Sequence, residues 1–215
     1  MIAGLIIICI PLAGRLIHQV RQARALKELD LIFSQYGENS LTPPRSAPNP
    51  TGGVPDPSEI PGETGDPGPT PTPYDPYDHE SFIIDGHAVI GVIDIPAIRM
   101  KSPVVEGVDL ENLAYAIGHF PGTAFPGTKG NSVLAGHRSY TFGSFFNRLD
   151  ELKPGDEIRL QTKKGTTRYT VSESFLVEPD DISVLKSSDD TRITLITCHP
   201  IYVPTHRLIV IGIAD

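Results

Sequence analysis

One cysteine of this 215-residue chain lies where it could do chemistry, at the end of the strand-like run RITLITCHP, residues 192–200. Alternate residues of a strand face opposite sides, so Cys198 emerges on one side at the carboxyl end of the run. A second run, HRLIVIGI, begins at His206 and places Arg207 nine residues after the cysteine. If the two strands pair, a guanidinium lies beside the thiol, where it favours the thiolate and can donate hydrogen bonds to an oxyanion.

A thiol nucleophile that attacks an acyl group also needs an acid for the leaving amine, and histidine usually supplies it. His137 ends the strand-like run NSVLAGH, much as Cys198 ends its own run. His199 and His206 compete with it from spacing alone, and Arg138 competes in the same way with Arg207. The residues therefore allow a His/Cys/Arg site without selecting its members.

Other interpretations of these residues stay open at this point. A lone cysteine at a strand end can be a small buried residue, or it can bind a metal together with His199 and His206. No fourth ligand and no zinc-like spacing accompany those three residues. His119, in GHFPGT, is expected to hold a turn. Asp180 and Asp181 precede ISVL and are expected to form a helix N-cap and first turn.

The residues that could position this chemistry belong to a segment of short strands, 82–215. Gly- and Pro-containing turns such as KPGD and KKGTT separate the runs. Three short helical pieces are expected, DLENLAYAI, GSFFNRL and DDISVL. Many short strands with such turns predict an all-β barrel or sandwich. The strand-like runs are HAVIGVIDI, KSPVVEG, NSVLAGHR, DEIRLQT, TTRYTVSESFLV, RITLITC and HRLIVIGI.

The preceding segment, 37–81, has the composition of an extended linker. It holds 12 of the 21 prolines and carries eight acidic residues against one basic residue, so most of the net charge of −8 lies there. Its apolar residues do not recur with the period of a helix or a strand, so the segment cannot build a core. The rest of the chain has no basic field of the kind that nucleic-acid binding needs.

The first segment, 1–36, begins with the apolar run MIAGLIIICIPLAG. Thirteen apolar residues span roughly 20 Å as a helix, which is less than the roughly 30 Å of a bilayer core. We therefore expect a membrane anchor of which part is missing, with a buried helix as the alternative. The basic residues after the run would by themselves place the following domain in the cytoplasm, so the orientation stays open. Leu16, Val20, Ala23, Leu26 and Leu29 have helical spacing and predict an amphipathic helix after the anchor.

Four blocks of the last segment resemble the sortase family in the same order. They are IDIPAIRMKSPVVEG (93–107), AIGHFPGTAFPGTKGNSVLAGH (116–137), NSVLAGHRSYTFGSFFNRLDELKPGD (131–156), and TLITC (194–198) with HRLIV (206–210). Sortases are membrane-anchored cysteine transpeptidases of Gram-positive bacteria with the signature TLxTC. The resemblance implies a closed eight-stranded β-barrel with a few short helices. It also implies that Cys198 is the nucleophile, His137 the proton donor and acceptor, and Arg207 the holder of the oxyanion or substrate.

The resemblance further implies an activity outside the membrane. The enzyme would cleave an LPxTG-like sorting signal and transfer the surface protein to a cell-wall amine, with no cofactor and no metal. The chain looks most like classes D and E. Class C enzymes, which polymerise pilins through a lysine, carry a lid with Asp-Pro-aromatic, and Asp75-Pro76-Tyr77 in the linker has that pattern. An anchored binding module without catalysis is the alternative from another class.

Overall fold

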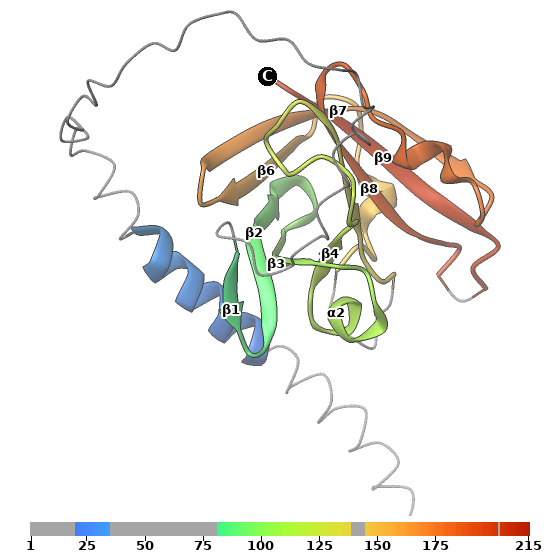
Figure 1. Cartoon of the computed structure of the whole chain (residues 1–215). Helices are drawn as coiled ribbons and strands as arrows, with labels where there is room; N and C mark the ends of the chain where they lie inside the picture. Colours follow the sequence, from blue (N-terminus) through green and yellow to red (C-terminus); the bar gives the residue numbers. More distant parts are fainter. Residues whose placement is uncertain (1–19, 35–80, 139–144, 202) are drawn as a thin grey trace, which may run out of the picture.

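The computed structural model describes residues 20–34, 81–138, 145–201 and 203–215. The expected linker 37–81 lies outside the described residues except for Ser81, and so do the Asp75-Pro76-Tyr77 triplet and the apolar run at 1–14. Within the described part, strands dominate and helices are short, apart from a helix at 20–34 (Figure 1). The strands are β1 (Phe82–Ile84), β2 (His87–Ile95), β3 (Met100–Glu106), β4 (Ile117–His119), β5 (Gly130–Ala135), β6 (Glu157–Thr162), β7 (Gly165–Val177), β8 (Thr191–His199) and β9 (His206–Ala214).

These strands close into a barrel. Their order in the sheet is β1-β2-β3-β4-β5-β8-β9-β7-β6, and a further pairing of β2 with β6 joins the two ends. Eight strands form the closed ring, while β1 pairs with β2 only. Among the pairs of adjacent strands, β3–β4 and β5–β8 are parallel. The closed eight-stranded barrel expected from the sequence is confirmed.

The seam between β2 and β6 depends on a glycine. A Cβ atom at Gly91 would lie 2.4 Å from the carbonyl oxygen of Gln161, closer than side chains and backbone can approach. Gly91 pairs with Thr162 at this seam. Glycine is therefore the residue that lets the two strands come together and close the ring.

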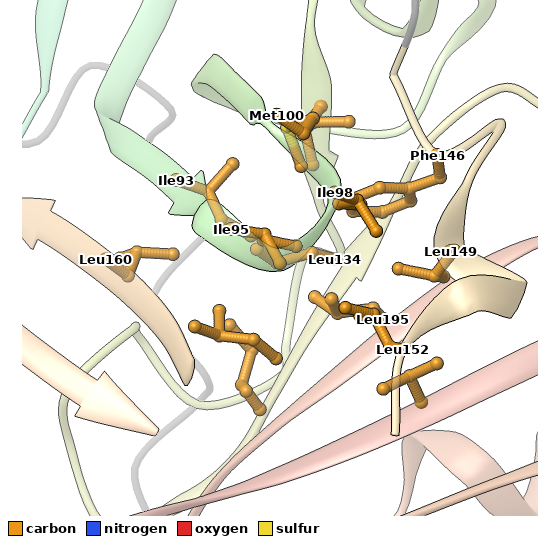
Figure 2. Close-up of a cluster of buried hydrophobic side chains, with 14 of the residues drawn as sticks. Ile93, Ile95, Ile98, Met100, Leu134, Phe146, Leu149, Leu152, Leu160 and Leu195 are labelled. Atoms are coloured by element: carbon orange, nitrogen blue, oxygen red, sulfur yellow. The ribbon is translucent and has the colours of Figure 1, made fainter. Parts of the chain in front are cut away.

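The inside of the barrel is a packed apolar core (Figure 2). β6 alternates in burial along EIRLQT, with Ile158 and Leu160 pointing inward. β2 is buried along nearly its whole length, because one face lines the barrel and the other is covered from outside. This double burial explains why HAVIGVIDI is a continuous apolar run and not an alternating one.

The cover over the outside of β2 is the helix at 20–34. Ala25, Leu29 and Phe33 are buried in a second apolar cluster with residues of β1, β2, β3 and α2 (Leu110–Tyr115). The expected amphipathic helix is present, and Leu29 lies on its buried face. Val20, by contrast, is 59% exposed, so the packed face is turned from the one that we predicted. The barrel surface against which the helix packs determines which face of the helix is buried. The helix sequence alone does not contain that information.

Short elements differ most from the expectations. β1 and β4 were not predicted as strands, since three residues are too few to show a period of two. The expected helix GSFFNRL begins outside the described residues, and within them Phe145 and Phe146 form a turn that leads into a 3-10 helix, η2 (Leu149–Glu151). The remaining 3-10 helices are η1 (Pro96–Ile98) and η3 (Ile182–Leu185). Asp181 caps η3 by accepting a hydrogen bond from the backbone N–H of Ser183, as expected. Among the described residues, no helix has both the length and the apolar content that crossing a membrane requires.

Candidate active site

Cys198 and Arg207 lie directly opposite each other on two paired strands. β8 and β9 are antiparallel neighbours, and their register pairs Cys198 with Arg207. Opposite residues of an antiparallel pair project on the same face, with Cβ atoms about 5 Å apart. The nine-residue spacing had predicted this juxtaposition if the strands paired, and the structure shows that they do.

The face that carries both residues is the outer face of the barrel. Ile193 and Leu195 of β8 belong to the barrel core, as does Leu208 of β9. Cys198 and Arg207 alternate with these residues and therefore point outward. Both are half-buried, so reagents from solvent can approach this face.

His137 follows the strand on the opposite side of β8 from Arg207. β5 runs parallel to β8, and Ala135 pairs with Ile196. The backbone continues this contact past the end of β5, because the N–H of Gly136 donates to the carbonyl oxygen of Ile196 at 3.1 Å. The same alternation, continued two positions along both strands, predicts His137 level with Cys198 on the outer face.

Arg207 is placed to accept an anion from outside the protein. Its Nη1 donates to the carbonyl oxygen of His206 at 3.2 Å. Within the part of the chain that the structure describes, no carboxylate forms a salt bridge with it. A guanidinium beside a thiol, with donors still to satisfy, suits a tetrahedral oxyanion formed on that thiol.

The competing residues have other partners. Arg138 is buried, donates to the ring of His199 and forms a salt bridge with Asp150. His206 contacts Thr205 through Nδ1 and lies 3.5 Å from Glu178 through Nε2.

The alternation of the strands also argues against the metal site considered above. His199 and His206 pair with each other one position beyond Cys198 and Arg207, so they lie on the other side of the strands from the thiol. Among the described residues, no group of three or more histidine, cysteine or acidic side chains could hold a metal ion.

A loop between β7 and β8 begins beside Arg207, because Val177, the last residue of β7, pairs with Arg207. The side-chain amide of Asn131 donates to the carbonyl oxygens of Val184 and Lys186, at 2.9 and 3.0 Å. Thr194 of β8 donates to the oxygen of the same amide. At the end of the loop, hydrogen bonds from Arg192 hold the pKa of Asp190 well below its ordinary value, at about 2. The loop is thus fixed to the two strands that carry His137 and Cys198.

Exposed apolar side chains occur in the loops that follow β7 and β8. Ile182 in this loop and Val203 between β8 and β9 are 75% and 67% exposed. Ala135 and Ile196, on the outer face, are half-buried. A surface cavity of about 240 Å³ lies elsewhere, between helix 20–34 and β3, and none of the three site residues lines it. Cys198 and Arg207 therefore lie on an accessible outer face and outside this cavity.

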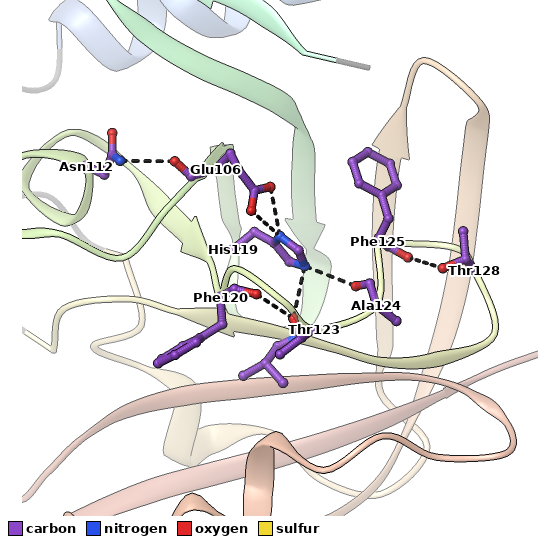
Figure 3. Close-up of polar contacts among 9 residues, drawn as sticks. Glu106, Asn112, His119, Phe120, Thr123, Ala124, Phe125 and Thr128 are labelled. Carbon is purple, nitrogen blue, oxygen red and sulfur yellow. Dashed lines mark hydrogen bonds and ion pairs between the residues drawn. The ribbon is translucent and has the colours of Figure 1, made fainter. Parts of the chain in front are cut away.

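A separate polar cluster lies around His119 and Glu106 (Figure 3). His119 had been identified from the sequence, but Glu106 had not. His119 holds a turn, as expected, by contacting the carbonyl oxygen of Ala124 at 3.0 Å and the hydroxyl of Thr123 through Nε2. Its Nδ1 lies 2.8 Å from the carboxylate of Glu106, and both side chains are buried. Both ring nitrogens of His119 thus have oxygen partners. Glu106 is the single acidic residue at the end of an apolar strand. That position was the sequence signal by which Glu106 could have been identified.

Comparisons with known proteins agree with this arrangement. The family model for the sortase domain matches residues 93–214. Sortase D of Bacillus subtilis (strain 168) is 33% identical over 111 residues, covering 51% of this chain and 54% of that protein. Sortase A of Listeria monocytogenes is 32% identical over 128 residues, covering 60% of this chain and 57% of that protein. The chain thus spans somewhat more than half the length of these relatives.

Solved structures show the same likeness. Sortase A from Corynebacterium diphtheriae superposes with a TM-score of 0.57 at 33% identity, covering 60% of this chain and 61% of that one. Sortase C1 of Streptococcus agalactiae superposes with a TM-score of 0.57 at 31% identity, covering 59% of this chain and 67% of that one. With a closed barrel, Cys198 opposite Arg207 on its outer face, and a family model that matches more than half of its length, this chain belongs to the sortase family.

Proposed function

We propose that this chain is a cysteine transpeptidase that acts on a sorting signal of the LPxTG kind. The observation that carries the proposal is the pairing of Cys198 with Arg207 on the outer face of the barrel, with His137 following the strand on the other side of β8. Membership of the sortase family supports the same assignment.

The first half of the reaction would form an acyl-enzyme. The Cys198 thiolate attacks the carbonyl carbon of the threonine, and the negative charge moves to the carbonyl oxygen, where Arg207 donates hydrogen bonds. The tetrahedral intermediate collapses with cleavage of the threonine–glycine C–N bond. His137, as the imidazolium, gives its proton to the departing amine. The products are a thioester on Cys198 and a free glycine amine.

The second half would reverse these roles. An acceptor amine attacks the thioester carbonyl, the C–S bond breaks, and the thiolate returns to Cys198. His137 takes the proton that the attacking amine loses, so the site is restored without any other reactant. Two ionisations then govern the rate, and they belong to the thiol–imidazole pair as a unit.

We propose a cell-wall precursor as the acceptor, with a function of the class D or E type. The similarity to sortases D and E supports this choice. A pilin lysine is the second candidate, because the chain also superposes on the sortase C1 of a pilus island, with a TM-score of 0.57. Competition between a glycine- or diaminopimelate-type amine and a lysine-bearing pilin peptide, with the product masses measured, separates the two.

We propose that the apolar run at 1–14 anchors the chain in a membrane, with the barrel outside the cell. Protease treatment of intact cells, with the full chain detected by antibody, tests this placement. Digestion of the barrel without lysis is the expected result. Protection until lysis would contradict the extracellular location, and recovery in the soluble fraction would contradict the anchor.

The decisive test of the activity combines labelling and kinetics. In a Cys9→Ser protein, Cys198 is the remaining thiol, and brief treatment with a methanethiosulfonate should add one adduct to the folded protein by intact mass. Cys198→Ala should lower the cleavage rate of a sorting-signal peptide by about a thousandfold or more, since loss of a nucleophile removes the covalent route. Cys9→Ser alone should cleave at the parent rate. Cleavage that survives Cys198→Ala would end the proposal, and an adduct formed only after denaturation would favour a binding module.

A further inference from the structure

The residues that directly follow His137 and Cys198 in the sequence contact each other. Nη1 of Arg138 lies 2.6 Å from Nδ1 of His199. β5 and β8 are parallel, so a step of one position along both strands turns both side chains to the opposite side. A second pair thus joins the two strand ends behind the proposed catalytic pair.

This contact makes His199 a hydrogen-bond acceptor. A guanidinium carries only hydrogen-bond donors, so Nδ1 of His199 accepts from Nη1 of Arg138. His199 is thus engaged on the side of the strands that faces away from the thiol.

Arg138 is itself held from the barrel side. Its side chain is only 3% exposed, and its Nη2 forms a salt bridge of 2.7 Å with Asp150. Its Nε donates to the carbonyl oxygen of Asn147 at 3.4 Å. Asn147 and Asp150 lie in segment 145–152, which places four apolar side chains in the barrel core: Phe145, Phe146, Leu149 and Leu152. Through Arg138, the end of β8 is connected to the core and not only to the neighbouring strand.

The same segment holds the backbone of His137. The N–H of Phe146 donates to the carbonyl oxygen of His137 at 3.2 Å. On the other side, Thr197 donates to the carbonyl oxygen of Gly136 at 2.8 Å. The backbone around His137 is thus hydrogen-bonded to β8 before it and to segment 145–152 after it. Arg138 contacts both of these parts, β8 through His199 and segment 145–152 through Asp150.

We infer that Arg138 and His199 form a positioning pair that sets the separation between the His137 imidazole and the Cys198 thiol. This inference rests on the proposed function, which assigns the proton transfers to His137 and the nucleophile to Cys198. Proton transfer needs donor and acceptor within hydrogen-bond reach, and a misplacement of about 1 Å can cost on the order of a hundredfold in rate. A pair that fixes two strand ends against each other acts on that separation.

Two replacements of His199 test the pair. His199→Leu removes the acceptor, whereas His199→Asn keeps an acceptor oxygen close to the place of Nδ1 and cannot become charged. Cleavage of a sorting-signal peptide is measured as kcat and KM, with kcat expressed per thiol titrated by a methanethiosulfonate, and thermal unfolding reports folding. We expect His199→Leu to lower kcat roughly 10- to 100-fold with KM changed about twofold or less, and His199→Asn to recover most of kcat.

A matched control separates positioning from a general loosening of segment 145–152. Arg148 lies in this segment, pairs with Glu151 at 2.6 Å and donates to the carbonyl oxygen of Ile98, on the other side from β8. Arg148→Gln should keep kcat near the parent value. If His199→Leu does not fold, His199→Ser replaces it, because a small side chain is tolerated at a half-buried position and cannot reach Arg138.

The inference is overturned if His199→Leu, or His199→Ser in its place, keeps the parent kcat. It is also overturned if Asn gives the same loss as Leu, or if Arg148→Gln reproduces the loss. Failure of the proposed function looks different, because cleavage would then survive Cys198→Ala in the otherwise unchanged chain.

Discussion

Arg207 is the residue whose chemistry depends most on geometry. It is paired in register with Cys198, and its guanidinium presents several donors in a planar fork toward the outer face. The nine-residue spacing was enough to predict that the two could meet, because antiparallel neighbours joined by a short loop have few possible registers. Spacing could not choose between Arg207 and Arg138. That choice depends on which side of the sheet each faces and on the salt bridge that occupies Arg138.

Arg207→Lys should therefore damage catalysis while leaving binding largely intact. Lysine keeps the charge but loses the fork, so it stabilises the oxyanion less well than arginine does. We expect kcat for a sorting-signal peptide to fall about 100- to 1,000-fold, the usual cost of losing an oxyanion donor, with KM little changed. Arg168→Lys, at a side chain 69% exposed on β7, should retain the parent kcat. An unchanged kcat in Arg207→Lys would remove the oxyanion role.

Glu106 and His119 show a residue-scale feature that the sequence did not disclose. The two are 13 positions apart on β3 and β4, and nothing in either run marks them as partners. Only the register of two short strands brings a buried carboxylate against a buried imidazole. Removing one member leaves the other side chain buried without its partner, which is strongly destabilising.

Glu106→Gln should accordingly lower the free energy of unfolding by about 3 kcal/mol. Glu178→Gln is the matched control, because Glu178 pairs with His206 at 3.5 Å with side chains 70% and 41% exposed. An exposed pair contributes at most about 1 kcal/mol, so the control should unfold near the parent urea concentration. Equal shifts in the two variants would show that the Glu106–His119 pair has no special role in stability.

At the scale of elements, alternation predicted the strands that line the barrel, and it failed where elements are short or irregular. β4 has three residues, and the chain around Phe145 and Phe146 forms a turn although its composition suits a helix. In both places long-range contacts decide the conformation, and a local window does not contain them. The loop between β7 and β8 is another such case, because Asn131 of β5 holds it from 53 residues away.

Asn131→Ala should loosen that loop. Two backbone carbonyl groups and the hydroxyl of Thr194 would lose their partner, at a cost of about 2 kcal/mol in the free energy of unfolding. Because the loop borders the site, we also expect KM for the sorting-signal peptide to rise more than kcat falls. Ser188→Ala is the control, since Ser188 bonds only within the loop, to the carbonyl oxygen of Asp190. If Asn131→Ala changed stability but left KM untouched, the loop would not contribute to substrate binding.

At the scale of the whole molecule, the helix at 20–34 belongs to the same packed body as the barrel. Phe33 meets Phe82 edge to face with ring centroids 5.9 Å apart, and Asp30 pairs with Lys101 of β3 at 3.3 Å. The sequence predicted a helix here but assigned it to an anchor region, because helical periodicity identifies an apolar face without naming its partner. The partner is the outer face of β2, whose continuous apolar run signals that it is covered on both sides.

If the helix is part of the cooperative unit, a cavity on its buried face must destabilise the entire barrel. Leu29 is fully buried against the barrel, and Leu31, two positions further on, is 60% exposed. Leu29→Ala should cost about 2–5 kcal/mol, the range for a buried leucine, whereas Leu31→Ala should stay within about 0.5 kcal/mol of the parent. Urea unfolding of the full chain, followed by circular dichroism and by Cys198 labelling in the Cys9→Ser background, should show coincident transitions shifted together in Leu29→Ala. Two results would contradict this prediction: the two leucine variants unfold alike, or Cys198 labelling follows the parent curve while the helix signal is lost at lower urea. Either result would mean that the helix packs on the barrel without stabilising the strands that carry the site.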